Sequence, residues 1–169
     1  MAHSEPESIA LARTLGERLQ ARGWLLATAE SCTGGGIAAA VTDISGSSAW
    51  FDRGFVTYSN AAKMDLLGVP VATLDAHGAV SGATAMAMAA GALARSAAQI
   101  AVAVTGVAGP TGGSAEKPVG TVWFGYAMTG EAPRACVRRF EGDRGAVREQ
   151  TVLRALADLI GLAEGRQPA

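Results

Sequence analysis

The sequence predicts an α/β fold of three layers, α/β/α, in which helices cover both faces of a mixed, partly parallel sheet. Over the first two thirds of the chain, stretches with helical spacing alternate with short apolar runs typical of buried strands. The last two expected strands are separated only by a turn around Gly130 and Pro133, so they should pair antiparallel. The chain has 169 residues and no internal repeat, so we expect one domain over residues 1–169, with an ordered core at about residues 8–163.

The first third contains two expected helices and two expected strands. A helix should run from Glu7 to Arg22, because apolar residues recur at helical spacing there, and Gly23 should end it. Residues 24–29 form a short apolar run typical of a buried strand, and residues 37–41 look helical. Residues 51–59 are rich in β-branched and aromatic side chains, which predicts the second strand.

The middle third contains two helices with expected polar caps. Asn60 can cap a short helix over residues 61–67, and Ser81 can cap a long one over residues 82–96. The many alanines of the long helix favour close packing, against the sheet or against a partner subunit. Residues 100–104 (IAVAV) are the clearest buried strand in the chain.

The last third begins with a glycine-rich loop and ends with a hairpin and a helix. The loop, residues 105–120, holds five glycines and two prolines. Residues 121–128 and 135–140 are the two strands of the expected hairpin. A final helix should start at residue 142 or 143 and end at Ile160.

Composition excludes several classes of protein. Hydrophobic residues make up 49% and charged residues 17% of the chain, which is typical of a globular protein. The formal net charge of −1 gives no sign of nucleic-acid binding. Two cysteines are too few for a disulfide scaffold, the N-terminal segment lacks the features of a signal peptide, and the apolar run at residues 83–94 is too short to span a bilayer. We therefore expect a cytoplasmic protein with no nucleic-acid or membrane partner.

Three polar loops follow the carboxyl ends of predicted strands, at residues 30–36, 59–63 and 105–113. Ligands of open α/β sheets bind at that edge. Exposed backbone N–H groups in such loops can receive an anion or a developing oxyanion.

Ser31 is a candidate nucleophile because it lies where a buried strand turns into a helix. This placement resembles a nucleophile elbow in outline, although the Gly-x-Ser-x-Gly pattern is absent. The amides of Cys32, Thr33 and Gly34 would then face the developing oxyanion. Alternatively, Ser31 or Thr33 simply caps the following helix.

A serine nucleophile needs a base, and the chain offers few candidates. Its two histidines are His3, near the N-terminus, and His77, beside a glycine, so a Ser-His-Asp triad would depend on His77 alone. No histidine or cysteine spacing suggests a metal site. Lysine can act as base where its surroundings lower its pKa, and the chain has only Lys63 and Lys117. A solvated surface lysine remains the alternative for Lys63.

The third polar loop, residues 105–113 (TGVAGPTGG), looks like a phosphate-binding loop. It is not a Walker A loop, because no Gly-Lys-Ser/Thr follows. A loop without regular structure and without a ligand is the alternative.

Five sequence blocks, in order over about residues 15–162, together resemble the CinA C-terminal family. The blocks are Thr28–Gly35 (TAESCTGG), Gly54–Asn60 (GFVTYSN) with Lys63 and Leu67–Val69, His77–Ser81 (HGAVS), Thr105–Val122, and Phe140 with Gly142–Arg144. The chain is similar to the stand-alone form of the family. The resemblance implies hydrolysis of the carboxamide of nicotinamide mononucleotide to nicotinate mononucleotide and ammonia, within pyridine-nucleotide salvage, without metal or organic cofactor. We also expect a homo-oligomer.

The resemblance also implies roles for individual residues. Ser31 would be the nucleophile, Lys63 its base, and Tyr58 a group that positions or relays the proton. Cys32 is a rival nucleophile, since a thiol beside a helix N-terminus can have a low pKa, but family members with Leu at this position count against it. Residues that would line the site or bind the substrate, with the 5′-phosphate on Arg144 and the loop amides, are Thr105, Gly35, Asn60, Gly106, Gly109, Gly112, Gly113 and Arg144.

Two other classes of function remain open from the sequence. A non-catalytic nucleotide-binding or regulatory module of the competence and damage-inducible type would use the same glycine-rich loops. An amidase or esterase with a different substrate would use the same Ser-Lys chemistry. A purely structural, oligomer-forming domain has only the alanine-rich segment in its favour.

Overall fold

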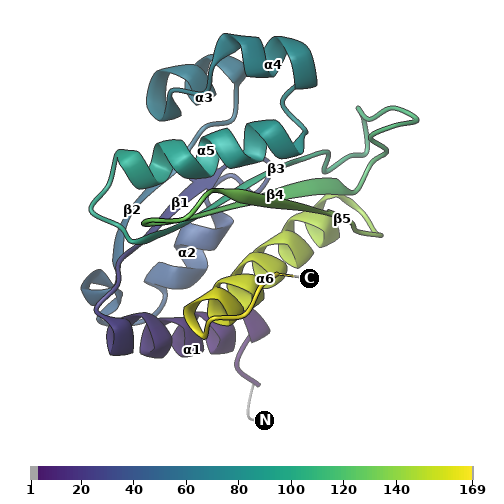
Figure 1. Cartoon of the computed structure of the whole chain (residues 1–169). Helices are drawn as coiled ribbons and strands as arrows, with labels where there is room; N and C mark the ends of the chain where they lie inside the picture. The colour runs from purple at the N-terminus through teal and green to yellow at the C-terminus, as the bar shows by residue number, and fades with distance from the viewer. Residues whose placement is uncertain (1–3, 169) are drawn as a thin grey trace.

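The computed structural model describes residues 4–168 and shows a five-stranded sheet with helices on both faces (Figure 1). The strand order is β2-β1-β3-β4-β5. The strands are β1 (Leu26–Glu30), β2 (Phe51–Val56), β3 (Ile100–Gly106), β4 (Thr121–Met128) and β5 (Arg134–Arg139). The helices are α1 (Glu7–Arg22), α2 (Gly36–Thr42), the short 3-10 helix η1 (Ser47–Ala49), α3 (Asn60–Leu67), α4 (Val71–His77), α5 (Gly82–Ala94) and α6 (Arg144–Ala163).

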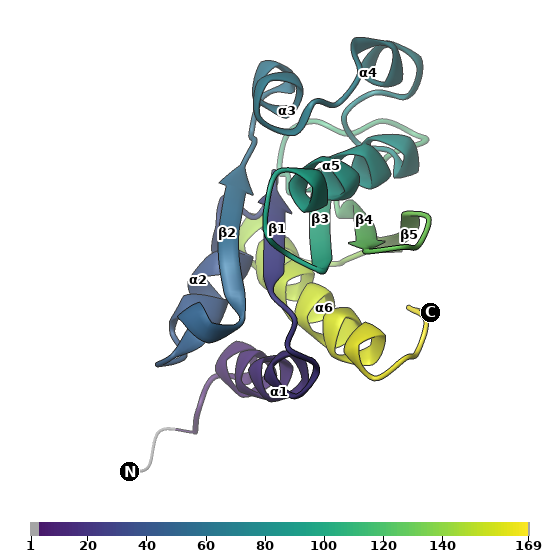
Figure 2. The ribbon, with the colours of Figure 1, turned by 60° about the vertical axis from the view of Figure 1, so that its left-hand side comes forward.

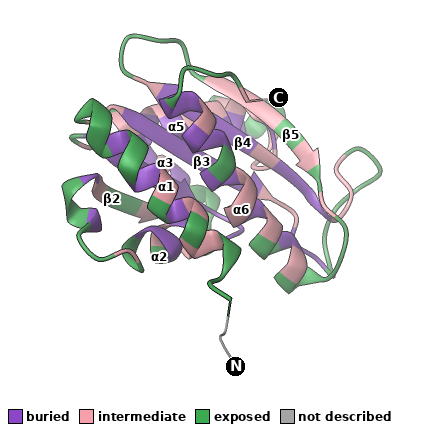
Figure 3. Cartoon of the chain, turned by 90° about the horizontal axis from the view of Figure 1, so that it is seen from below, coloured by how far each residue is buried: buried purple, intermediate pink, exposed green. Residues whose placement is uncertain are grey.

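The helices form two layers around the sheet. Helices α1, α2 and α6 lie on one face, and α5 lies on the other with α3 and α4 stacked above it (Figures 1 and 2). Two apolar clusters correspond to these faces: Leu15, Ile37 and Leu156 belong to the first, and Leu67 and Met88 to the second. Burial is greatest along β1, β3 and β4, whereas the edge strand β5 is mostly half-buried or exposed (Figure 3). Among the described residues, no helix is both long and apolar enough to cross a membrane.

Small residues bring α5 very close to the sheet. In β1 and β3, alternate positions that face α5 are alanines, and they belong to the cluster built around that helix. Gly125 on β4 lies directly beneath α5, and a Cβ atom there would be 2.1 Å from the carbonyl oxygen of Ala85. Gly91 allows the same close approach to Leu67 of α3, at 2.0 Å. The alanine-rich helix thus finds its packing partners within one chain, between the sheet and α3 and α4.

The register of the sheet places the three polar loops at one edge. Strand β1 runs parallel to both β2 and β3, and Glu30 at its end pairs with Val56 and with Val104. The chain continues this ladder just beyond the strands, because Ser31 N–H donates to Val104 O at 3.0 Å and Thr57 N–H donates to Glu30 O at 2.9 Å. The segments that follow β1, β2 and β3 therefore begin side by side.

The predicted α/β class and the antiparallel hairpin are confirmed. The helix at Glu7–Arg22 and the strand at Thr121–Met128 have the expected bounds. The other expected elements are present with ends that differ by a few residues; β2, for example, stops at Val56 because its partner β1 stops at Glu30.

Two local features differ from what the sequence predicted. Ser59, not Asn60, caps α3, since its Oγ accepts from the N–H of Ala62 at 3.0 Å. Residues 71–77 form the helix α4, which we did not predict; Pro70 precedes it, and its seven residues are too few for a clear helical period. His77 is the last residue of this helix. The prediction about His3 lies outside the described residues.

Candidate active site

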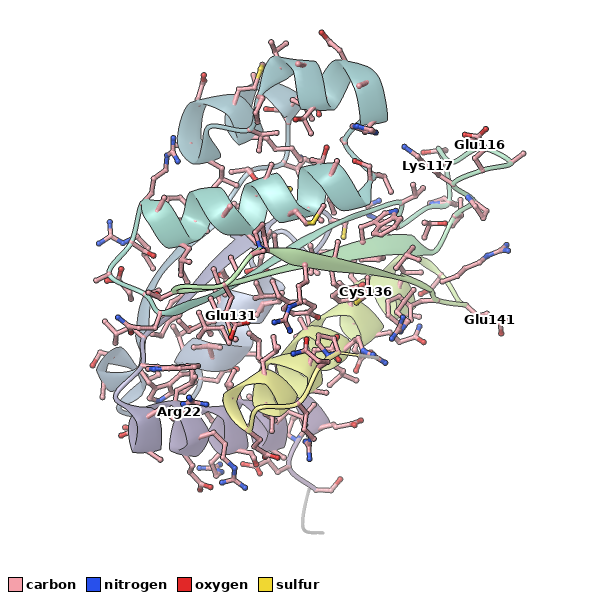
Figure 4. All side chains as sticks on the ribbon, in the orientation of Figure 1. Arg22, Glu116, Lys117, Glu131, Cys136 and Glu141 are labelled. Carbon is pink, nitrogen blue, oxygen red and sulfur yellow. The ribbon has the colours of Figure 1, made fainter. Side chains whose placement is uncertain are left out.

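The three loops enclose a cleft of about 200 Å³ at the carboxyl edge of the parallel strands. Its lining combines residues from the loops after β1, β2 and β3 with the segment before α5 and the start of α6. The lining residues are Ser31, Cys32, Tyr58, Asn60, Lys63, Ala79, Val80, Thr105, Gly106, Ala108 and Arg144. A larger hollow of about 360 Å³ lies near Arg22 and Glu131 (Figure 4), and it contains none of these residues.

Ser31 and Lys63 meet inside the cleft. The Lys63 Nζ lies 3.0 Å from Ser31 Oγ and donates a second hydrogen bond to Thr57 O at 2.8 Å. Ser31 is fixed by its position directly after β1, and Lys63 lies in the first turn of α3, which follows β2. Lys63 is only 1% exposed and Ser31 8% exposed. The alternative of a solvated surface lysine is therefore wrong.

The surroundings of Lys63 favour its neutral form. Burial lowers the pKa of Lys63 below its ordinary value of 10.5, because the charged ammonium loses its hydration. Within residues 4–168, no carboxylate forms a salt bridge with Lys63 that would offset this loss. A neutral amine can donate to Thr57 O and still accept the Ser31 proton through its lone pair.

The Cys32 thiol is buried and has a raised pKa, whereas a reactive cysteine is accessible and has a lowered one. Cys32 lines the cleft but is 5% exposed, and burial raises its pKa to about 12. The thiolate, which is the nucleophilic form, is therefore scarce at neutral pH. This argues against Cys32 as the rival nucleophile.

A buried carboxylate organises the loop that carries Ser31. Glu30, 1% exposed, accepts hydrogen bonds from Thr33 Oγ1 at 2.6 Å and from the N–H groups of Ile37 and Ala38 at 2.8 and 3.0 Å. The last two bonds cap α2, whose N-cap position is Gly35, without a side-chain cap of its own. Neither Ser31 nor Thr33 caps this helix, so the alternative of a simple helix cap is also wrong.

Of the three amides expected to face an oxyanion, two remain available. The N–H of Gly34 donates to Ser31 O at 3.0 Å, so the expectation that Gly34 contributes to an oxyanion site was wrong. The N–H groups of Cys32 and Thr33 donate to no other residue in the described part of the chain. On the other side of the loop, Arg148 of α6 donates to the carbonyls of Cys32 and Thr33 at 3.1 and 3.2 Å.

Tyr58 and Arg144 form a separate pair at the mouth of the cleft. Arg144 donates to Tyr58 Oη at 2.8 Å and to Gly109 O at 2.9 Å. Tyr58 is 61% exposed and has no hydrogen bond to Ser31 or Lys63. The expected proton relay through Tyr58 is therefore absent from this structure, which places the phenol beside Arg144 instead.

Thr105 holds another wall of the cleft. It is 1% exposed, and its Oγ1 donates to Ala79 O at 2.8 Å, which fixes the segment between α4 and α5 against the end of β3.

Lys117, in the loop that extends beyond the sheet (Figure 4), donates to His77 O at 2.8 Å. Neither Lys117 nor His77 lines the cleft, so neither is placed to serve Ser31 as base.

The other predicted binding residues divide into two groups. Asn60 and Gly106 line the cleft. Gly109 does not line it, but its carbonyl oxygen accepts a hydrogen bond from Arg144, which does. Gly35 lies outside, where a Cβ atom would be 3.5 Å from Val56 Cγ2. Gly112 and Gly113 also lie outside the lining, on the exposed part of the loop. Among the described residues, no group of three or more His, Cys, Asp or Glu side chains could hold a metal ion.

Comparison with known proteins identifies the family of the chain. The CinA C-terminal domain family matches residues 8–162. Relatives named nicotinamide-nucleotide amidohydrolase PncC include one from Enterobacter agglomerans, 56% identical over 90% of this chain and 93% of its own length. Another, from Escherichia coli strain K12, is 52% identical over 92% and 94%. The crystal structure of competence/damage inducible protein CihA from Agrobacterium tumefaciens superposes with a TM-score of 0.90, at 50% identity over 96% of this chain and 99% of that one. The chain therefore belongs to the CinA C-terminal domain family.

Proposed function

We propose that this protein is an amidohydrolase that converts nicotinamide mononucleotide to nicotinate mononucleotide and ammonia. The relatives that match nearly the whole chain carry the name of that activity. The observation that carries the proposal is the buried pair formed by Ser31 Oγ and Lys63 Nζ, 3.0 Å apart in the cleft. A hydroxyl beside a desolvated amine that forms no salt bridge with a carboxylate of the described residues is an arrangement suited to amide hydrolysis by a serine.

The first half of the reaction forms an ester on the enzyme. Neutral Lys63 accepts the proton of Ser31 while Oγ bonds to the carboxamide carbon, and the carbonyl oxygen becomes an oxyanion facing the amides of Cys32 and Thr33. The C–N bond then breaks as the Lys63 ammonium gives its proton to the leaving nitrogen. Ammonia departs, and the nicotinoyl group remains on Ser31.

The second half repeats the chemistry with water. Lys63 takes a proton from a water molecule, whose oxygen bonds to the ester carbon. The bond between that carbon and Ser31 Oγ then breaks, and the proton passes from Lys63 to Oγ. Nicotinate mononucleotide is released, and the enzyme returns to its starting state.

The 5′-phosphate is assigned to the exposed side of the cleft. Arg144 lies at the first position of α6, where the helix dipole also favours an anion. Its guanidinium donates to an uncharged carbonyl and an uncharged phenol in this structure. A phosphate would be a better partner, because its negative charge strengthens the hydrogen bonds. The N–H groups of the loop that starts at Gly106 are the further expected donors.

Incubation of the purified protein with nicotinamide mononucleotide tests the proposal. Ammonia and nicotinate mononucleotide should appear in equal amounts, and Ser31→Ala should abolish both. Cys32→Ala is the matched control and should retain most of the activity. Binding of the nucleotide without turnover would instead indicate the non-catalytic, regulatory function, and turnover of simple amides or esters alone would indicate a different substrate.

We also propose that the protein acts in the cytoplasm and as a homo-oligomer. Both cysteines of the chain are free thiols, as expected in a reducing compartment. Several apolar side chains are well exposed, including Val56 at 50% and Leu66 at 46%. Light scattering of the purified protein measures the oligomeric state directly.

A further inference from the structure

Arg148 contacts the back of the loop that carries Ser31. It lies on α6 one turn after Arg144, and it donates from Nε to Cys32 O at 3.1 Å and from a terminal nitrogen to Thr33 O at 3.2 Å. Within residues 4–168 it forms no ion pair with a carboxylate. Its guanidinium is thus committed to two backbone carbonyls that lie more than 100 positions earlier in the chain.

The bond to Cys32 O fixes the orientation of the Thr33 amide, an expected oxyanion donor. The bond to Thr33 O holds the next peptide, whose N–H is that of Gly34 and donates to Ser31 O. In a trans peptide the N–H points opposite to the carbonyl of the preceding residue. Because the carbonyl of Cys32 points to Arg148, the N–H of Thr33 points away from Arg148, and it has no acceptor among the described residues. Thr33 is held from the other side as well, since its Oγ1 donates to Glu30.

The glycines of the loop do not fix its backbone by themselves. Gly34 and Gly35 both have positive φ angles, +61° and +103°, and glycine backbones are the least restricted of all. A Cβ atom at Gly34 would lie 3.3 Å from a terminal nitrogen of Arg148, so the guanidinium packs directly on the glycine. The positive charge also polarises the peptide that it contacts, which makes the Thr33 N–H a stronger donor.

We propose that Arg148 is a positioning residue of the reaction. It acts through the peptide that joins Cys32 to Thr33, whose N–H is an expected oxyanion donor, and it does not itself touch the substrate. The inference rests on the proposed Ser31 chemistry, but it does not depend on which amide or ester is the substrate.

The test compares Arg148→Gln and Arg148→Lys with Arg138→Gln as matched control. Arg138 is a partly exposed arginine of β5 that likewise donates to a backbone carbonyl, that of Val137. Two rates are measured: turnover of nicotinamide mononucleotide, and phosphonylation of Ser31 by a fluorophosphonate probe. The probe reacts through its own oxyanion-like transition state, so it reports on the loop even if the nucleotide is not the substrate. Thermal unfolding of each variant shows whether the fold is kept.

Arg148→Gln should lower kcat and the phosphonylation rate by about tenfold or more, with KM changed less than threefold. This is less than the roughly 100- to 1,000-fold loss expected when an oxyanion donor is removed outright. Arg148→Lys keeps the charge and one hydrogen bond, so it should recover part of both rates, and Arg138→Gln should match the wild type. If Arg148→Gln is too unstable to assay, Arg148→Lys alone must slow both reactions at unchanged KM.

Two outcomes separate this inference from the proposed function. Slower phosphonylation of the Arg148 variants in a protein that does not turn over the nucleotide would support the positioning role and refute the substrate. An unchanged phosphonylation rate, or a loss seen only in KM, would overturn the positioning role even if the wild type is a fully active deamidase.

Discussion

The two sides of the cleft differ in how firmly they are built. On the Ser31 side, the reacting groups are buried, and each is fixed by a strand or helix: Ser31 by β1, Lys63 by α3. On the Arg144 side, the side chains are exposed, and within residues 4–168 Arg144 donates hydrogen bonds to Gly109 O and to the 61% exposed Tyr58. The comparison indicates that bond-making groups are preorganised before the substrate arrives, whereas the phosphate-binding groups must exchange partners when it binds.

Replacing Lys63 should have the largest effect. Lys63→Met fills the same space without the amine, so kcat should fall by about 1,000-fold, as expected for loss of a general base. The unfolding free energy should not fall, since methionine has no charge to desolvate. Steady-state kinetics and thermal unfolding measure the two effects, with Lys117→Met as control. A folded Lys63→Met variant with near-normal kcat would exclude Lys63 as the base.

Replacing Arg144 should affect binding rather than chemistry. Arg144→Ala should raise KM for the nucleotide by about 10- to 100-fold, in line with the loss of charge-assisted hydrogen bonds. The change in kcat should be much smaller, because Arg144 has no hydrogen bond to Ser31 or Lys63. Initial rates over a range of substrate concentrations separate the two constants. The opposite pattern, a lower kcat at unchanged KM, would move Arg144 to the chemical side of the cleft.

The pH dependence should report the buried amine. Only neutral Lys63 can accept a proton, so kcat/KM should rise about tenfold per pH unit until the pH reaches the lowered pKa of Lys63, and level off above it. Stability should change in the same direction: between the lowered pKa and the ordinary value of 10.5, the unfolded chain binds a proton that the folded chain does not, so the unfolding free energy rises with pH. Denaturant titrations at several pH values should show this rise in the wild type and a smaller rise in Lys63→Met.

The tether between Thr105 and Ala79 should give the smallest effect. Thr105→Val removes the hydrogen bond to Ala79 O but keeps the shape, which should cost about 1 kcal/mol of stability. Because this bond only holds a wall of the cleft, kcat/KM should fall by several-fold at most, and Thr105→Ser should restore it. A loss as large as that of Lys63→Met would give Thr105 a direct part in the reaction.

The strands and the reacting pair could be predicted from the sequence, but the supports of the loop could not. Ser31 and Lys63 each follow a recognisable strand, but their pairing as nucleophile and base was an expectation from the resemblance to the CinA C-terminal family. Arg148 gives no such signal, because its contacts with Cys32 and Thr33 depend on how α6 packs across the sheet. Glu30 could have been found: a carboxylate at the end of an apolar strand must be satisfied locally.

The hydrogen-bond partner of Tyr58 and the helix α4 could not be predicted from the sequence, for different physical reasons. The family resemblance implied that Tyr58 positions or relays the proton, but side-chain direction after a strand ends is not set by the two-residue period of the strand. Tyr58 lies two residues beyond β2 and turns to Arg144. The seven residues of α4 are covered on one side only, with Leu74 as the one buried residue, so the segment has too little apolar pattern to be recognised.

The hydrogen bonds that extend the sheet by one residue, from Ser31 to Val104 and from Thr57 to Glu30, have a consequence for how such enzymes can diversify. They make the spacing of hydroxyl and amine depend on strand register and on the short segment between β2 and α3, not on the length of the glycine-rich loop. Insertions in the glycine-rich loop can therefore change which nucleotide is accepted while the nucleophile stays next to its base, whereas a single residue inserted into β1 would turn Ser31 to the opposite face of the sheet.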